Sequence, residues 1–285
     1  MFKKAINGLK LLYFFFFRNA EKLNNDKLEA LLRARVHAIE KHGNIEDTTD
    51  FASMIWGRQM YHEAKKRNLL SKEELEWCEQ VLFGRQIIKS SHSISEIQED
   101  NLNTVIKNRR SIRSWQEGEL TENEFKVLID AARWAPSSSH RQSWHFLLTR
   151  DKEKIKLLSE IRGQKFVRNA PNCIIALINL HAYDGIEINY TPYLDAGAAI
   201  QNLLLMAHSI GYGACWVNFG EKEIPDKKKM NKIKELFGIP ANIKIVSIIP
   251  IGKLPLTTPN APGRKNTTDI MHVERFKSVK HEKNE

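Results

Sequence analysis

Two short basic segments, far apart in the chain, hold the residues best suited to chemistry. The first places three arginines around a serine: Arg109, Arg110, Ser111 and Arg113. An arginine guanidinium offers forked N–H donors that match phosphate oxygens, and a serine hydroxyl adds a further donor. The second segment supplies Arg264 and Lys265 after a proline-rich turn. Either segment alone is typical of a solvated basic loop, but the two together predict a clamp for one phosphate.

The stretch APSSSHRQSW (135–144) gathers three serines between a proline and a tryptophan. The helix expected before it begins at a capping box formed by Thr121 and Glu124 and must stop at Pro136. Residues 136–142, which we call the serine loop, therefore follow directly after the C-terminal end of that helix.

Length and composition predict a globular protein, since 285 residues that are 42% hydrophobic can bury one substantial core and a smaller second one. The three cysteines, Cys78, Cys173 and Cys215, are widely spaced and form no CxxC pair. This spacing indicates neither a disulfide framework nor a zinc site, and it favours a reducing, cytoplasmic setting.

The formal net charge of +10 is compatible with a nucleic acid, an anionic membrane surface or an anionic ligand as partner. Many lysines lie in mixed-charge stretches such as EKEIPDKKKMNKIKE (221–235), which are typical of solvated surface. Aromatic residues do not alternate with arginines in the way that stacks bases, so we expect no nucleic-acid partner.

The N-terminus combines basic residues with an apolar run, Leu9–Phe17, that only Lys10 interrupts. The run is too short to cross a bilayer and lacks a signal-peptide cleavage site. Two interpretations remain open. Residues 1–20 could form an interfacial anchor on a membrane, or a first helix docked on the body or on a second subunit.

Apolar spacing predicts helices over residues 26–42, 49–69 and from a Ser71–Glu74 capping box to about residue 89. Residues 1–95 therefore read as an all-helical region, and the polar stretch at 90–101 reads as a linker. Beyond it the pattern mixes helix and strand, with continuous apolar runs at 144–149, 173–180 and 243–252 that predict buried strands. A helix opening at Thr191-Pro192 and reaching Gly211 carries small residues that permit close approach of another backbone, such as its symmetry mate.

Several short motifs follow one another in an order that is similar to that of a known protein family. No single one of these motifs is specific to that family. RRSxR is followed by APSSxxxQxW, DAGAAIQNLLLMA, GYGACWVN, a strand ending in PIG, and a basic pair before HVERF. In this order they resemble the FMN-dependent nitroreductase family over residues 104–276. The N-terminal stretch LLRARVHAIEKHG is also similar to the helical leader of some bacterial nitroreductase-like proteins.

The resemblance implies an α+β fold, with a central, mostly antiparallel sheet wrapped by helices. It implies a homodimer with two flavin sites at the interface, in which each serine loop approaches the isoalloxazine ring bound to the opposite subunit. Residues 96–285 would form the FMN-binding domain. The helical region 1–95 would then be a lid, a dimer brace or a membrane tether.

By the same resemblance, FMN would be held by residues from four segments. These are Arg109, Arg110, Ser111, Arg113, Pro136, Ser137, Ser138, Gln142, Trp216, Val217, Asn218, Arg264 and Lys265. The arginines and Ser111 would hold the phosphate and the pyrimidine side of the ring, and the 216–218 segment, after a turn at 211–213, would run beside the polar edge of the ring. The chain departs from the family pattern at His140, where asparagine is usual, and at Ser143, where proline is usual.

The implied activity is an NAD(P)H-dependent flavin oxidoreductase that passes hydride from NADH or NADPH through FMN to a nitro, quinone or related small substrate in a ping-pong cycle. No side chain is assigned as the proton donor. His140 is a candidate by location, the alternative being that it packs locally, and Cys215 is expected to be a small buried filler. Residues 181–191, with Tyr183, Tyr190 and Tyr193, could cover the substrate. The competing hypothesis is a flavin-binding or interaction scaffold with little turnover.

Overall fold

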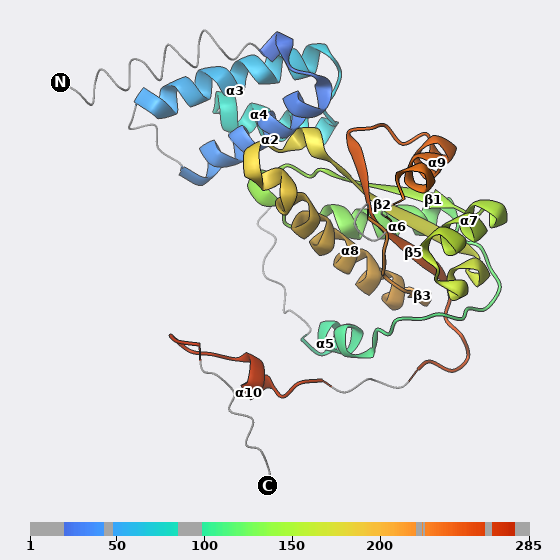
Figure 1. Ribbon diagram of the computed structural model, residues 1–285. Coiled ribbons are helices and arrows are strands. Elements are labelled where there is room, and N and C mark those ends of the chain that lie inside the picture. Colours follow the sequence, from blue (N-terminus) through green and yellow to red (C-terminus); the bar gives the residue numbers. More distant parts are fainter. Residues whose placement is uncertain are drawn as a thin grey trace.

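The structure, a computed structural model, describes residues 20–42, 48–84, 99–220, 224, 226–259 and 264–276. The hypotheses on residues 1–20 thus fall outside the described residues, apart from Ala20. Figure 1 shows a helical layer at the N-terminal end, a sheet flanked by helices, and a C-terminal arm that extends from the body.

The sheet is antiparallel throughout its described strands. Its strands are β1 (Trp144–Thr149), β2 (Asn172–Asn179), β3 (Tyr212–Ala214), β4 (Val217–Asn218) and β5 (Ile243–Lys253). The order is β1-β2-β5-β3, and β4 pairs with β5 beside β3. β2 and β5 are almost wholly buried because both faces of the sheet are covered, which is why their sequences are continuous apolar runs.

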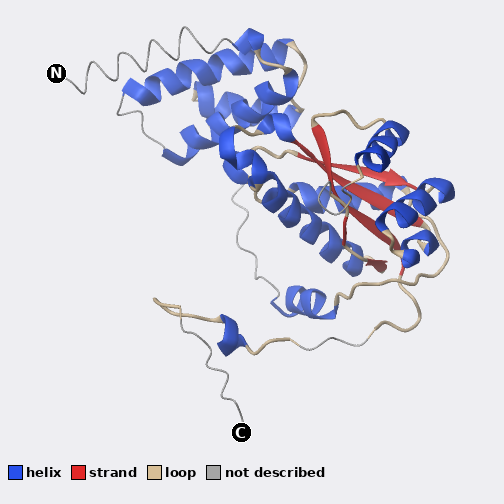
Figure 2. Ribbon diagram, viewed as in Figure 1, coloured by secondary structure: helices blue, strands red, loops and turns tan. Residues whose placement is uncertain are grey.

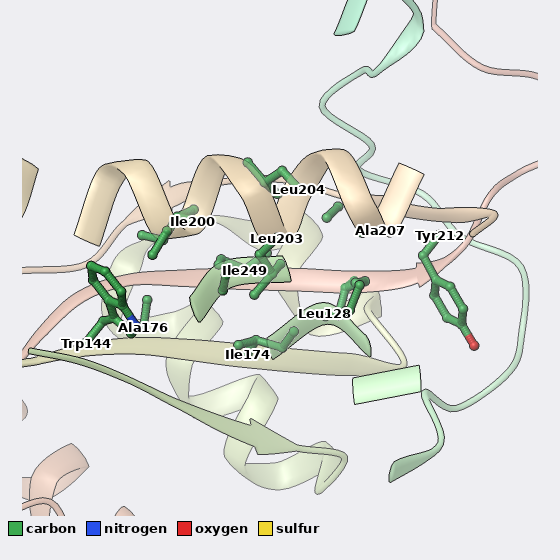
Figure 3. Packing of buried hydrophobic residues seen from close by; sticks show 14 of the residues in the cluster. Leu128, Trp144, Ile174, Ala176, Ile200, Leu203, Leu204, Ala207, Tyr212 and Ile249 are labelled. Carbon is green, nitrogen blue, oxygen red and sulfur yellow. The ribbon is translucent and has the colours of Figure 1, made fainter. Parts of the chain in front are cut away.

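Helices cover both faces of this sheet, as Figure 2 shows. On one face lie α6 (Glu122–Arg133) and α8 (Thr191–Ser209), and Figure 3 shows Ile200, Leu203 and Leu204 of α8 over Ile174 and Ile249 of the sheet. On the other face lie α7 (Lys152–Arg162) and α9 (Lys227–Phe237), whose apolar residues share a core with β2 and β5. This helix–sheet–helix arrangement is the α+β class that the sequence predicts.

The N-terminal helices have a hydrophobic core of their own. α2 (Asn25–His42), α3 (Thr48–Lys66) and α4 (Lys72–Phe83) follow a short turn, Ala20–Lys22, and pack around Leu28, Leu32, Met60 and Leu82. We call residues 20–83 the N-terminal helical unit. Arg33 of α2 ties the unit together, because its guanidinium pairs with Glu29 at 2.8 Å and with Glu74 of α4 at 2.7 Å.

Local signals predicted several element boundaries well. Both capping boxes are present, at Ser71–Glu74 and Thr121–Glu124. The third helix ends at Phe83 rather than near 89, because Gly84 takes the left-handed conformation that terminates a helix. The N-cap of α8 is Tyr190, one residue before the predicted Thr191, and the helix ends at Ser209.

The predicted turn at 211–213 is wrong. Only Gly211 has the turn conformation, with φ at +83°, and Tyr212–Ala214 is strand β3 against β5. The predicted linker at 90–101 is helical from Glu99, where α5 (Glu99–Asn108) begins, and its earlier residues lie outside the described part of the chain.

Candidate functional site

The first basic segment is fixed to the sheet by backbone and side-chain contacts. Ser111 forms a parallel bridge with Ala214 of β3, and the Ile112 amide donates to the Ala214 carbonyl at 3.1 Å. The Trp115 indole donates to the Gly213 carbonyl at 2.7 Å. A Cβ at Gly213 would lie 2.6 Å from the Ile112 side chain. Glycine is therefore required there for the basic segment to lie this close to β3.

The structure brings the two basic segments together. Burial lowers the pKa of Arg109, and the positive charges of Arg110 and Arg264 lower it further. No carboxylate in the described part of the chain pairs with Arg109, Arg110 or Arg113. We call Arg109, Arg110, Arg113 and Arg264 the arginine cluster.

Like charges held together in this way favour the binding of an anion, because an anion removes their mutual repulsion. Within the described residues the buried Nε of Arg110 has no hydrogen-bond partner, while its Nη1 donates to the carbonyls of Lys107 at 2.5 Å and Arg109 at 3.0 Å. Lys265, the neighbour of Arg264, is exposed.

Cys215 lies beside the arginine cluster and is buried. Burial raises the pKa of its thiol, although Arg113, Arg109 and a hydrogen bond with Ser111 oppose that rise. The thiol stays protonated at neutral pH, as expected of a small buried filler.

The segment after Cys215 lines a cleft of about 750 Å³. Its residues are Leu180, Ile188, Asn189, Tyr190, Tyr193, Leu194, Trp216, Asn218, Gly220 and Val246. Within the described structure, the buried indole N–H of Trp216 has no acceptor. Tyr190 and Leu194 are largely exposed at this cleft, whereas Val217 points away into the core.

The serine loop is held by a buried carboxylate. The Ser138 amide donates to both oxygens of Asp195, at 3.0 and 3.1 Å, and the Tyr183 hydroxyl donates to the same carboxylate at 2.5 Å. Ser143 in turn bonds Tyr183 at 2.8 Å, so the family's usual proline would remove this contact. The sequence analysis did not single out Asp195, although this residue opens the DAGAAIQ motif. The signal that could have identified it is the presence of a carboxylate in a helix whose other inward-facing residues are mostly apolar.

Tyr183, predicted as part of a substrate cover, is only 3% exposed and belongs to this hydrogen-bond network, so it does not line the cleft. Burial and the bond to Asp195 raise its pKa above the usual value. Tyr190 and Tyr193 do line the cleft.

Three residues of the serine loop have left-handed backbone angles. The φ values of Ser139, His140 and Gln142 are +50°, +55° and +50°. Such angles cost about 1–3 kcal/mol each and persist only where surrounding contacts fix them. His140, the candidate proton donor, stacks on His37 of α2 and meets Trp77 of α4 edge-on. It therefore packs against the N-terminal helical unit.

The serine loop and the arginine cluster lie toward opposite ends of α8. In Figure 1, α5, which leads into the first basic segment, lies beside the β3 end of α8. Asp195 near the start of α8 bonds the serine loop, whereas His208 near its end is close enough to Arg109 and Arg110 for their charges to lower its pKa, after burial. The thirteen-residue separation corresponds to roughly 20 Å at 1.5 Å per residue. Within one chain, Pro136, Ser137, Ser138 and Gln142 thus do not meet the arginine cluster.

Two features are absent from the residues that the structure describes. No group of histidine, cysteine or acidic side chains among them is arranged to hold a metal ion. No helix among them is long and apolar enough to cross a membrane.

Comparison with known proteins gives a consistent answer. The Nitroreductase family model matches residues 106–169 and 159–253. A protein of Methanothermobacter thermautotrophicus, named as an NADH dehydrogenase/NAD(P)H nitroreductase, is 32% identical over 202 residues, covering 69% of this chain and 99% of the relative. An FMN reductase (NADPH) of Bacillus subtilis is 26% identical and covers 60% of this chain and 76% of its own length.

A solved structure agrees with these relatives. A nitroreductase from Desulfovibrio desulfuricans, determined in complex with FMN, superposes with a TM-score of 0.52 at 26% identity, covering 62% of this chain and 98% of that one. The findings confirm the fold, the FMN cofactor and the class of enzyme that the sequence predicts, an NAD(P)H-dependent flavin oxidoreductase. With a family match over more than half its length, the chain belongs to the nitroreductase family.

Proposed function

We propose that this enzyme transfers hydride from NADH or NADPH, through FMN, to a nitro, quinone or related small oxidised substrate in a ping-pong cycle. The observation that carries the proposal is the arginine cluster. Arg110 and Arg264 lie close enough to Arg109 for their charges to act on it, and within the described residues the buried Nε of Arg110 has no hydrogen-bond partner. This is a suitable site for the phosphate of FMN.

The donors in this region fit FMN. Arg109, Arg110, Ser111, Arg113 and Arg264, with Lys265 beside them, would hold the phosphate and the pyrimidine end of the ring. Trp216 and Asn218 follow Cys215 in the chain, beside β5, and both line the cleft. The indole N–H of Trp216, which has no acceptor among the described residues, can donate to a bound group. Bound FMN supplies a two-electron carrier, and positive groups near its pyrimidine end stabilise the reduced form.

A second copy of the chain would complete the site. Because the serine loop lies roughly 20 Å along α8 from the arginine cluster of its own chain, Pro136, Ser137, Ser138 and Gln142 would instead line the flavin of a partner. This supports a homodimer. The division into a helical region 1–95 and a flavin domain 96–285 is part of the same proposal.

The cleft beside Trp216 would receive both reactants in turn. Tyr190, Tyr193 and Trp216 offer aromatic faces, which suit a nicotinamide or a flat substrate ring. Since one cleft serves both, the oxidised nicotinamide must leave before the substrate enters. His140 packs against His37 and Trp77, which favours water as the proton source.

The absorbance spectrum of the purified protein, followed by anaerobic addition of NADH and NADPH in turn, tests the proposal. We expect a visible flavin band that at least one nucleotide bleaches. A band that neither nucleotide bleaches would contradict the proposed donors and favour the scaffold hypothesis. Absence of flavin that added FMN does not restore would contradict the site itself.

Initial rates at several fixed concentrations of NAD(P)H test the order of the reaction. Double-reciprocal plots against a nitroaromatic compound, a quinone and free flavin should give parallel lines for the best of the three substrates. Intersecting lines would show that both reactants bind together and would overturn the ping-pong cycle.

A further inference from the structure

We propose that the N-terminal helical unit is a clamp that fixes the conformation of the serine loop, and that His140 is the positioning residue through which it acts. The proposal rests on the proposed function in one respect only, that the serine loop lines the flavin of a partner. The clamp itself is argued from contacts within this chain.

His140 connects the loop to two helices at once. Its ring centroid lies 5.8 Å from that of His37, with an interplanar angle of 28°, and 5.3 Å from that of Trp77, at 63°. His37 belongs to α2 and Trp77 to α4. One loop residue is thus stacked on one side and met by a ring edge on another.

The loop needs such contacts because its backbone is held in an unfavourable conformation. Ser139, His140 and Gln142 are all left-handed, and none is glycine. The body of the protein holds the loop at Ser138, whose amide donates to Asp195, and at Arg141, which pairs with Glu187 at 3.1 Å and lies over the Tyr183 ring. Inside the loop, the Gln142 amide donates to the Ser137 hydroxyl at 3.1 Å. The left-handed residue His140 makes its ring contacts with the N-terminal helical unit, which adds a second support to the middle of the loop.

His140 also transmits its position to the next part of the loop. Its Nε2 lies 2.9 Å from the side-chain amide nitrogen of Gln142, which lies in the segment proposed to approach the flavin. Movement of the His140 ring would therefore move Gln142. This explains why histidine rather than the family's usual asparagine suits position 140 in a chain that has these helices, since asparagine would not reach both aromatic rings.

The helical unit is itself anchored to the body, as a clamp must be. Lys27 of α2 pairs with Asp184 at 2.5 Å and donates to the Tyr183 carbonyl at 3.2 Å. The Asn242 side chain donates to Asp26 of α2 at 3.2 Å. These contacts attach α2 beside the loop, and the Arg33 ion pair with Glu74 holds α4 to α2.

The test compares Trp77→Ala with Phe83→Ala in the full-length protein. Phe83 is a matched control because it is also an α4 ring, but it contacts Tyr61 and His62 instead of the loop. We measure amide hydrogen exchange of residues 136–143 in the flavin-free protein, and separately the Kd for FMN. Trp77→Ala should speed exchange in the loop and weaken FMN binding by about tenfold, while Phe83→Ala leaves both unchanged. Equal effects of the two variants, or none from Trp77→Ala, would overturn the clamp.

A double-mutant cycle tests whether the effect of Trp77→Ala on the loop depends on His140. In a His140→Asn background, which retains a residue that tolerates left-handed angles, Trp77→Ala should cause no further change in loop exchange. Additive effects would show that Trp77 acts through general stability and would refute the role of His140. If the wild type binds no FMN, the proposed function fails, but the exchange measurements still decide the clamp.

Discussion

The carboxylate of Asp195 and the backbone amide of Ser138 join the start of α8 to the serine loop, through hydrogen bonds of 3.0 and 3.1 Å. Asp195 is buried and also accepts from Tyr183. An asparagine in its place would keep one acceptor oxygen and put an N–H₂ group where a second is needed. We expect Asp195→Asn to lower the free energy of unfolding by about 1–3 kcal/mol.

Urea denaturation of Asp195→Asn measures this loss, with Asp130→Asn as the control. Asp130 is an exposed α6 carboxylate that pairs with Arg133 at 2.6 Å. Its replacement should change stability by less than about 0.5 kcal/mol. Equal stability losses in the two variants would mean that Asp195 has no special part in holding the loop.

The arginine cluster should determine flavin affinity. Arg109→Ala removes one guanidinium of the cluster. A lost charge-assisted hydrogen bond of about 1.5–3 kcal/mol corresponds to roughly 10- to 100-fold weaker FMN binding. Titration of the flavin-free protein with FMN, followed by flavin fluorescence, gives the Kd. Because relief of repulsion stabilises the flavin-free fold, its melting temperature should not fall.

Lys156→Ala is the control for net charge, since Lys156 is an exposed cation on α7 that pairs with Glu153 at 3.6 Å. It should leave the FMN Kd within about twofold, as expected for an exposed pair. Wild-type affinity in Arg109→Ala would exclude the phosphate role of this residue.

Gly213 should be intolerant of a side chain, because a Cβ there would lie 2.6 Å from Ile112 Cγ1. Gly213→Ala would push the basic segment away from β3. We expect a loss of about 1–3 kcal/mol in stability and a weaker affinity for FMN. Adding Ile112→Ala removes the clashing atoms and should restore part of the FMN affinity, so failure of that rescue would contradict the steric explanation.

FMN binding should depend on pH through His208. Burial, and then Arg109 and Arg110, lower the pKa of this histidine below its usual value of about 6.5. A lowered pKa means that the unfolded chain binds more protons, so the contribution of His208 to stability is complete above pH ~6.5 and is lost as pH falls through the folded-state pKa.

A phosphate bound to the arginine cluster would neutralise those charges and raise the pKa of His208. FMN binding should then take up a proton, and FMN affinity should rise as pH falls from about 7.5 toward 6. His208→Gln should remove this rise, leaving only the titration of the phosphate itself near pH ~6. Identical Kd profiles between pH 5.5 and 8 for wild type and variant would contradict the coupling.

The sequence by itself determined the elements whose signals are local. Capping boxes fixed the starts of α4 and α6, and continuous apolar runs predicted β1, β2 and β5 because these strands are covered on both faces. The order of the motifs was enough for the family. Helix α9 lies in a lysine-rich stretch that the sequence assigns to solvated surface, and most of its residues are indeed outside the core, with only Met230 and Ile233 buried.

Only the tertiary structure decided which residues meet. The approach of Arg264 to Arg109 depends on the path of the chain around β5, and no periodicity encodes it. The same holds for the distance between the serine loop and the arginine cluster, which the length of α8 sets. From the sequence, His140 is a candidate proton donor because it lies in the serine loop. Only the folded chain shows that its ring packs against His37 and Trp77. Contacts between distant residues arise from the packing of whole elements, so a one-dimensional pattern can supply the parts of a site but not its assembly.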